Sequence, residues 1–116
     1  IVDIVLKIKV GALSVEAANA RHEHEWKVWE EVKLPADMLL IPGVVGHAAN
    51  TVEHPELVAQ RLTNFASLVG RENVIAGTDC GFSQGSLNPR VHASIMWAKL
   101  SALVEGAQIA SNRLWG

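Results

Sequence analysis

The 116-residue sequence predicts a single α/β domain built on a parallel sheet, and three observations lead to this prediction. Short apolar runs alternate along the chain with stretches of helical periodicity. The apolar runs lack strict alternation, which is typical of parallel strands covered on both faces. The resulting order is helix, strand, helix, strand, helix, strand, helix, as expected for an α/β fold with a parallel sheet.

The first predicted helix lies in residues 1–10, where the pattern is ambiguous. The spacing of Ile1, Val5 and Ile8 is helical, whereas the β-branched content would suit a strand. We favour the end of a helix, because the run from Lys9 to Gly11 is typical of a helix stop. The three predicted strands follow at residues 12–16, 38–45 and 73–78.

Three further helices are predicted between and after the strands. Residues 23–32 carry Trp26 and Trp29 on one face. Residues 55–69 place apolar side chains at i, i+4, i+7 and i+11, with Pro55 in the first turn and Gly70 at the end. The last helix covers residues 89–113, and Gly106 weakens it by about 1 kcal/mol relative to Ala.

Composition excludes several classes of protein. An apolar fraction of 49% with 19% charged residues argues against disorder. Ten basic and twelve acidic residues leave no electrostatic footprint for nucleic acid. The apolar runs are far shorter than the roughly 20 residues that cross a bilayer. One cysteine excludes an internal disulfide framework and fits a reducing compartment, so we expect a cytoplasmic protein. The chain opens at Ile1, so we expect its true start to lie upstream.

The number of strands leaves two architectures open. A closed eight-stranded (β/α)8 barrel of the TIM type needs about 250 residues, and three strands cannot close one. The chain is therefore either a small open sheet or the last part of a larger barrel.

A chemically reactive side chain follows each predicted strand. Glu16 ends the first, His47 follows the second and Cys80 follows the third. The carboxyl ends of parallel strands meet at one mouth, and carboxylate, imidazole and thiolate are all zinc ligands. The alternatives are structural: Cys80 as a small buried hydrophobe, Glu16 paired with Arg21, and His47 hydrogen-bonded within its loop.

Two further histidines raise a different possibility. His22 and His24 have the His-x-His spacing of some metal sites, which would suit a metal-dependent hydrolase. That chemistry needs the pair on a strand, whereas the acids and tryptophans nearby predict a helix start, where acids favour the helix dipole. We therefore interpret this segment as structural or as facing a substrate.

The strand ends carry a resemblance to a known family. Residues 78–82 (TDCGF) resemble the last zinc-ligand segment of cobalamin-independent methionine synthases. Residues 13–18 (LSVEAA) resemble the strand with a zinc-binding glutamate, and residues 41–47 (IPGVVGH) the strand before a substrate-facing histidine. Residues 21–26 (RHEHEW) favour the shorter methionine synthase II-like branch. Order and spacing hold over nearly the whole chain.

The resemblance implies the C-terminal portion of a (β/α)8 barrel, with all 116 residues in one incomplete barrel domain. It implies zinc as cofactor, with Cys80 and Glu16 as ligands, and His47 as proton donor or substrate-orienting group. Asp79 would support the cysteine loop, and Glu16, Asp79 and Asn50 would contact substrate. The family's further His-x-Cys ligands have no counterpart in these residues, and catalytic zinc sites usually take three protein ligands, so we expect these residues alone to be inactive.

The implied activity is methyl transfer from a methylated folate to a thiol such as homocysteine, as in methionine biosynthesis. Relatives that resemble epoxyalkane-coenzyme M transferases use the same zinc-thiolate chemistry on another electrophile. A second hypothesis is a non-catalytic barrel fragment that self-associates as a homo-oligomer or completes another chain, because three strands leave open sheet edges.

Overall fold

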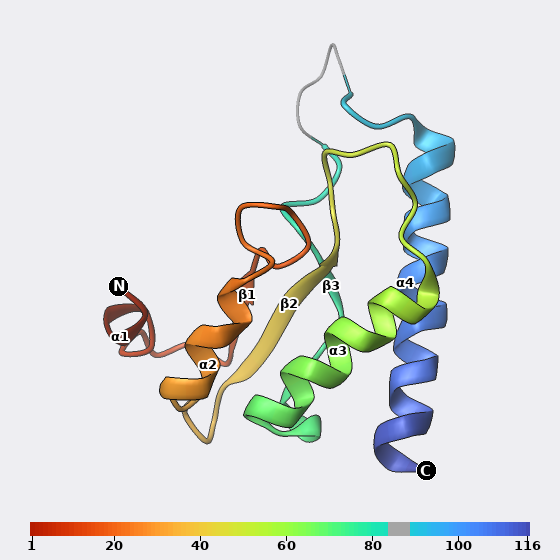
Figure 1. Ribbon diagram of the computed structural model, residues 1–116. Helices are drawn as coiled ribbons and strands as arrows, with labels where there is room; N and C mark the ends of the chain where they lie inside the picture. Colours follow the sequence, from red (N-terminus) through yellow and green to blue (C-terminus); the bar gives the residue numbers. More distant parts are fainter. Residues whose placement is uncertain (84–88) are drawn as a thin grey trace.

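A computed structural model describes residues 1–83 and 89–116, which form a three-stranded sheet with helices packed against it. Figure 1 shows this arrangement. The strands are β1 (Ala12–Val15), β2 (Leu39–Val45) and β3 (Gly77–Thr78), in the order β1-β2-β3. Both pairings are parallel. The predicted α/β class, with about three parallel strands alternating with helices, is confirmed.

Helix α3 (Pro55–Val69) is the central packing element. It packs on β2 and contacts both α2 (Val28–Glu31) and the long α4 (Ala93–Trp115). The predicted bounds of α3 are confirmed at both ends. Pro55 occupies the first turn, and Gly70 caps the C-terminus with a φ of 96°, which a side chain rarely adopts.

The apolar stripe of α3 supplies both halves of the core. Val58 and Leu62 pack with Val44, Val45 and Ala110 under α4. Phe65, one turn further on, packs with Ala17, Trp29 and Leu40 on the side of β1. Burial of each large apolar side chain contributes about 1.5–3 kcal/mol, so the two clusters fix how the strands lie against the helices.

The edge strand β1 departs from the sequence prediction. Leu13 and Val15 pack against the Trp29 cluster, but Ala12 and Ser14 are exposed. The expected cover on both faces is therefore wrong for β1. Among the residues that the structure describes, no element packs on the second face, so the burial alternates along this strand.

The N-terminal helices are shorter than expected. Helix α1 (Val2–Val5) ends with its cap at Leu6, so the predicted stop at Lys9 to Gly11 lies too far along the chain. The helix predicted over residues 23–32 is a 3-10 turn, η1 (Glu25–Lys27), followed by the single α-turn of α2. The backbone N–H groups of His22 and Glu23 donate to the Asn19 carbonyl, which delays the helix.

Two C-terminal elements also begin later than predicted. Strand β3 covers only the end of residues 73–78, after the 3-10 turn η2 (Arg71–Asn73) and an isolated bridge between Val74 and Leu40. Helix α4 starts at Ala93, because the His92 side chain accepts a hydrogen bond from the backbone N–H of Ser94. His54 caps α3 in the same way, through the N–H of Glu56.

Gly106 has a packing role that its helix propensity does not reveal. The residue is buried where α4 crosses α3, and a Cβ there would overlap the Val58 side chain. The glycine therefore allows the two helices to approach closely, and its expected weakening of the helix is not its main effect. No helix within residues 1–83 and 89–116 is long and apolar enough to cross a membrane.

Candidate metal centre

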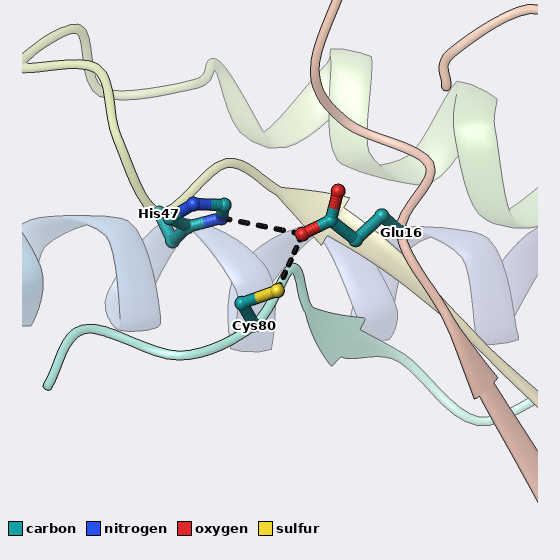
Figure 2. A group of neighbouring side chains, drawn as sticks. All are labelled: Glu16, His47 and Cys80. Carbon is teal, nitrogen blue, oxygen red and sulfur yellow. Dashed lines mark hydrogen bonds and ion pairs between the residues drawn. The ribbon is translucent and has the colours of Figure 1, made fainter. Parts of the chain in front are cut away.

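Three ligand-type side chains meet at the carboxyl edge of the sheet, as the sequence predicts (Figure 2). Glu16 directly follows β1, His47 lies two residues after β2 and Cys80 lies two residues after β3. Parallel pairing places all three strand ends at the same edge. The fold thus gathers residues that are 64 positions apart in the chain.

One carboxylate oxygen lies at the centre of the group. The Cys80 thiol donates a hydrogen bond to Glu16 Oε1, and His47 Nδ1 lies 3.9 Å from the same oxygen. One ligand atom from each of the three residues falls within 4.8 Å of the other two. Such spacing allows three donors to converge on one ion.

The residues present fit a zinc ion in two respects: the chemical type of their side chains, and the presence of a buried nitrogen without a hydrogen-bond partner. Thiolate, imidazole and carboxylate are zinc ligands, and catalytic zinc sites commonly take three protein ligands. Among the residues that the structure describes, none forms a hydrogen bond with the buried His47 Nδ1, a rare condition for a buried polar atom. The unpartnered nitrogen, close to Glu16 and Cys80, can therefore meet a cation or a substrate bound beside these two side chains.

Asp79 connects the glutamate loop to the cysteine loop. Its side chain is fully buried, and Oδ1 accepts hydrogen bonds from the backbone N–H groups of Ala17 at 2.9 Å and Ala18 at 3.2 Å. Oδ2 accepts from Asn19 Nδ2, which also donates to Glu16 Oε2. Asp79 therefore holds the backbone next to Glu16. Because Asp79 is also the residue before Cys80, it links the loops that carry these two side chains.

Gly43 makes this connection possible. The Asp79 carboxylate passes over β2 at this residue to reach the loop after β1, and a Cβ on Gly43 would overlap Asp79 Oδ1. Only glycine leaves the space for that crossing. The Asp79 side-chain bonds run to the glutamate loop, so the predicted support of the cysteine loop by Asp79 stays a prediction.

Hydrogen bonds within the site shift three pKa values. The Cys80 thiol lowers the pKa of Glu16, an effect that Asn19 and the nearby histidines reinforce and desolvation opposes. The Glu16 carboxylate in turn raises the pKa of Cys80, with desolvation acting in the same direction. The hydrogen bond to Glu25 raises the pKa of His22.

The structure also decides between alternatives that the sequence leaves open. Cys80 is exposed and bonded to a carboxylate, so its interpretation as a buried hydrophobe is wrong. Among the described residues, no ion pair joins Glu16 to Arg21; His22 Nε2 instead lies 3.4 Å from Glu16 Oε2. His22 and His24 lie in turns before η1 and not on a strand, which removes the basis for a hydrolase site.

Asn50, a predicted substrate contact, lies exposed in the loop that begins with Gly46 and His47. Within residues 1–83 and 89–116 it forms no hydrogen bond to the other predicted site residues. The substrate-binding roles of Glu16, Asp79 and Asn50 stay predictions.

Sequence reasoning missed two residues that support the site, Asn19 and Gly43, and also the buried Lys99 of α4. The first two carry no pattern that separates them from ordinary loop and strand residues. Lys99 could have been recognised from the sequence, because it lies in the buried stripe of α4 together with Ala102, Gly106 and Ala110. A lysine in a helical stripe of small apolar residues signals a buried partner.

Comparisons with known proteins find a similar fold and little else. No protein-family model matches the chain, and no curated protein does. The chain is similar to the solved structure of a B12-independent methionine synthase from Shewanella sp. W3-18-1 in complex with selenomethionine, with a TM-score of 0.77 and 24% identity. The match covers 96% of this chain but 29% of that one. The three strands and their helices thus follow part of a barrel enzyme's backbone.

Proposed function

We propose that this chain is the C-terminal, zinc-ligating part of a catalytic barrel that transfers a methyl group from a methylated folate to a thiol such as homocysteine. The convergence of Glu16, His47 and Cys80 at three strand ends carries the proposal. Two further observations support it: the family-like segments around these residues, and a backbone that follows a methionine synthase. The free thiol of Cys80 is consistent with a reducing, cytoplasmic setting.

In the proposed site, Glu16 and Cys80 hold the zinc ion. Zinc, when bound, supplies a Lewis acid that keeps a coordinated substrate thiol deprotonated near neutral pH. Asn19 and Asp79 keep the Glu16 carboxylate turned toward Cys80 through the bonds described above. The preorganised carboxylate loses little conformational freedom when it binds a cation.

His47 has the second role. During methyl transfer the substrate sulfur forms a bond to the methyl carbon, the carbon–nitrogen bond breaks, and the electron pair stays on the leaving nitrogen. That nitrogen then needs a proton, and in this proposal His47 donates it from its imidazole. Its Nδ1 makes no competing hydrogen bond within the described residues, so the ring is available for this step.

A zinc titration with matched variants tests the proposal. We expect the purified protein to bind zinc, Cys80→Ala and Glu16→Gln to lower the stoichiometry or affinity, and Glu30→Gln, an exposed glutamate of α2, to leave both unchanged. Unchanged zinc binding in Cys80→Ala would count heavily against the site.

A methyl-transfer assay on the proposed complete barrel tests the reaction itself, with homocysteine and methylated tetrahydrofolate as substrates and methionine as product. His47→Gln should lower methionine formation about 10²- to 10⁴-fold, the usual contribution of a general acid. His24→Gln, an exposed histidine, is the control. Zinc binding without methionine formation would favour the non-catalytic fragment or an enzyme for another electrophile, such as an epoxide.

A further inference from the structure

A lysine of α4 is buried and reaches the loop that carries His47. Lys99 has no exposed area, and burial of an ammonium group costs several kcal/mol unless good partners are present. Its Nζ donates to Glu53 Oε1 at 2.5 Å and to the Thr51 carbonyl at 2.7 Å. Both partners belong to the segment between β2 and α3, which we call the His47 loop (residues 46–54).

Glu53 continues this connection to the start of the same loop. Its second carboxylate oxygen, Oε2, accepts a hydrogen bond from the backbone N–H of Gly46 at 2.6 Å. Gly46 directly precedes His47. Glu53 thus closes the His47 loop by joining its first residue to its end, and Lys99 fastens the closed loop to α4.

The His47 side chain makes no hydrogen bond within the described residues, and the nearest backbone bond to a side chain is that of the preceding Gly46 N–H to Glu53. Its Nδ1 has no partner, and its nearest charged group is the Glu16 carboxylate at 3.9 Å. The position of the imidazole relative to Glu16 and Cys80 therefore depends on where the loop backbone lies. The backbone position in turn depends on the bond from Gly46 to Glu53.

We propose that Lys99 and Glu53 are positioning residues that hold His47 against Glu16 and Cys80. They act through the Gly46 N–H and the Thr51 carbonyl, and neither bonds directly to the three residues of the candidate metal centre among the described contacts. The expected effect of these two residues on zinc affinity rests on the proposed function. Their effect on the position of His47 does not depend on it.

Two neutral double variants separate positioning from folding. Replacing both partners of a buried ion pair by neutral groups of similar volume is often neutral for stability or stabilising, whereas removing one charge is strongly destabilising. Lys99→Met with Glu53→Met removes the acceptor of the Gly46 N–H. Lys99→Met with Glu53→Gln keeps an oxygen at that place. Arg113→Met is the control, because it breaks an exposed ion pair between α4 and Glu56 of α3.

The first measurement is the NMR resonance of the His47 ring in chelator-treated protein, assigned through His47→Gln. We expect the resonance to shift or broaden in the Met/Met variant, to return toward its original position in the Met/Gln variant, and to stay unchanged in Arg113→Met. An unchanged His47 resonance in a folded Met/Met variant would overturn the proposal, whether or not the protein binds zinc.

The second measurement is zinc affinity in the same variants, with folding checked by circular dichroism. The Met/Met variant should bind zinc about 10- to 100-fold more weakly, because His47 would no longer lie beside the zinc ligand Glu16 as its outer partner. The Met/Gln variant should recover part of the affinity. Equal affinities in all variants would contradict the positioning role, while absence of zinc binding in the unaltered protein contradicts the proposed function and leaves the His47 resonance to decide.

Discussion

At the scale of single residues, the site combines a prediction from sequence with contacts that only the fold reveals. Glu16, His47 and Cys80 could be named in advance, because each follows an apolar run and parallel strands end together. The crossing of Asp79 over Gly43 could not, since it depends on the register of three strands. Local sequence contains no record of that register.

The contact between Glu16 and Cys80 predicts an effect on thiol reactivity in the metal-free protein. The carboxylate raises the pKa of Cys80, so at neutral pH less of the thiol is ionised than in an isolated cysteine. Glu16→Gln removes the negative charge, and the pKa should fall toward its ordinary value. Because the thiolate is the nucleophile, alkylation by iodoacetamide should become faster near pH 8.

The measurement is the rate of alkylation as a function of pH after removal of metal. The midpoint of the profile should move to lower pH in Glu16→Gln and stay in place in Glu30→Gln. A midpoint that is the same in all three proteins would show that Glu16 and Cys80 do not interact in solution.

At the scale of elements, the bounds of a helix are predicted correctly where its start and stop residues agree with its apolar periodicity. Helix α3 has a start residue, Pro55, a stop residue, Gly70, and an apolar stripe between them, and these three signals predict its bounds correctly. The segment of η1 and α2 has only a short stripe, and hydrogen bonds to the Asn19 carbonyl shorten the helix. Such competition between a turn and a helix is decided by the surrounding structure, which no local pattern describes.

The packing of α4 on α3 reverses the expected effect of a substitution. From helix propensity alone, Gly106→Ala should stabilise the protein by about 1 kcal/mol. A Cβ there would overlap Val58 and lie 2.7 Å from the Pro55 carbonyl, and overpacking costs about 1–3 kcal/mol. We therefore expect a net loss of stability on the order of 1 kcal/mol.

Urea denaturation of the variant and of Gly11→Ala as control measures this effect. Gly11 is exposed, and a Cβ at this residue would meet no atom within 4 Å, so its substitution should be close to neutral. A Gly106→Ala protein more stable than the original would mean that α3 and α4 do not pack this closely.

At the scale of the whole molecule, the candidate metal centre lies where three separate chain segments meet. Each of Glu16, His47 and Cys80 belongs to a different strand end, and a cation held by Glu16 and Cys80 would link the first of these ends to the third. The chain spans under a third of the methionine synthase chain that it resembles in fold. Within the described residues, β1 and β3 each pair only with β2, so both are edge strands. An edge strand can pair with another chain, and self-association or the completion of another sheet therefore stays an expectation.

Zinc should therefore stabilise the folded chain as a whole. At a free concentration 100 times the Kd, a ligand that binds only the native state contributes about 2.7 kcal/mol, which corresponds to a rise in Tm on the order of 10 °C for a domain of this size. Thermal denaturation with zinc and with chelator measures the rise. It should vanish in Cys80→Ala, and a rise that persists there would place the stabilising ion elsewhere.

The most direct measurement of the central claim is zinc K-edge X-ray absorption on the purified, zinc-loaded protein. We predict one sulfur neighbour at about 2.3 Å together with nitrogen or oxygen neighbours at about 2.0–2.2 Å, with the sulfur contribution lost in Cys80→Ala. A shell of oxygen and nitrogen alone in the unaltered protein would contradict the assignment of zinc to Glu16 and Cys80.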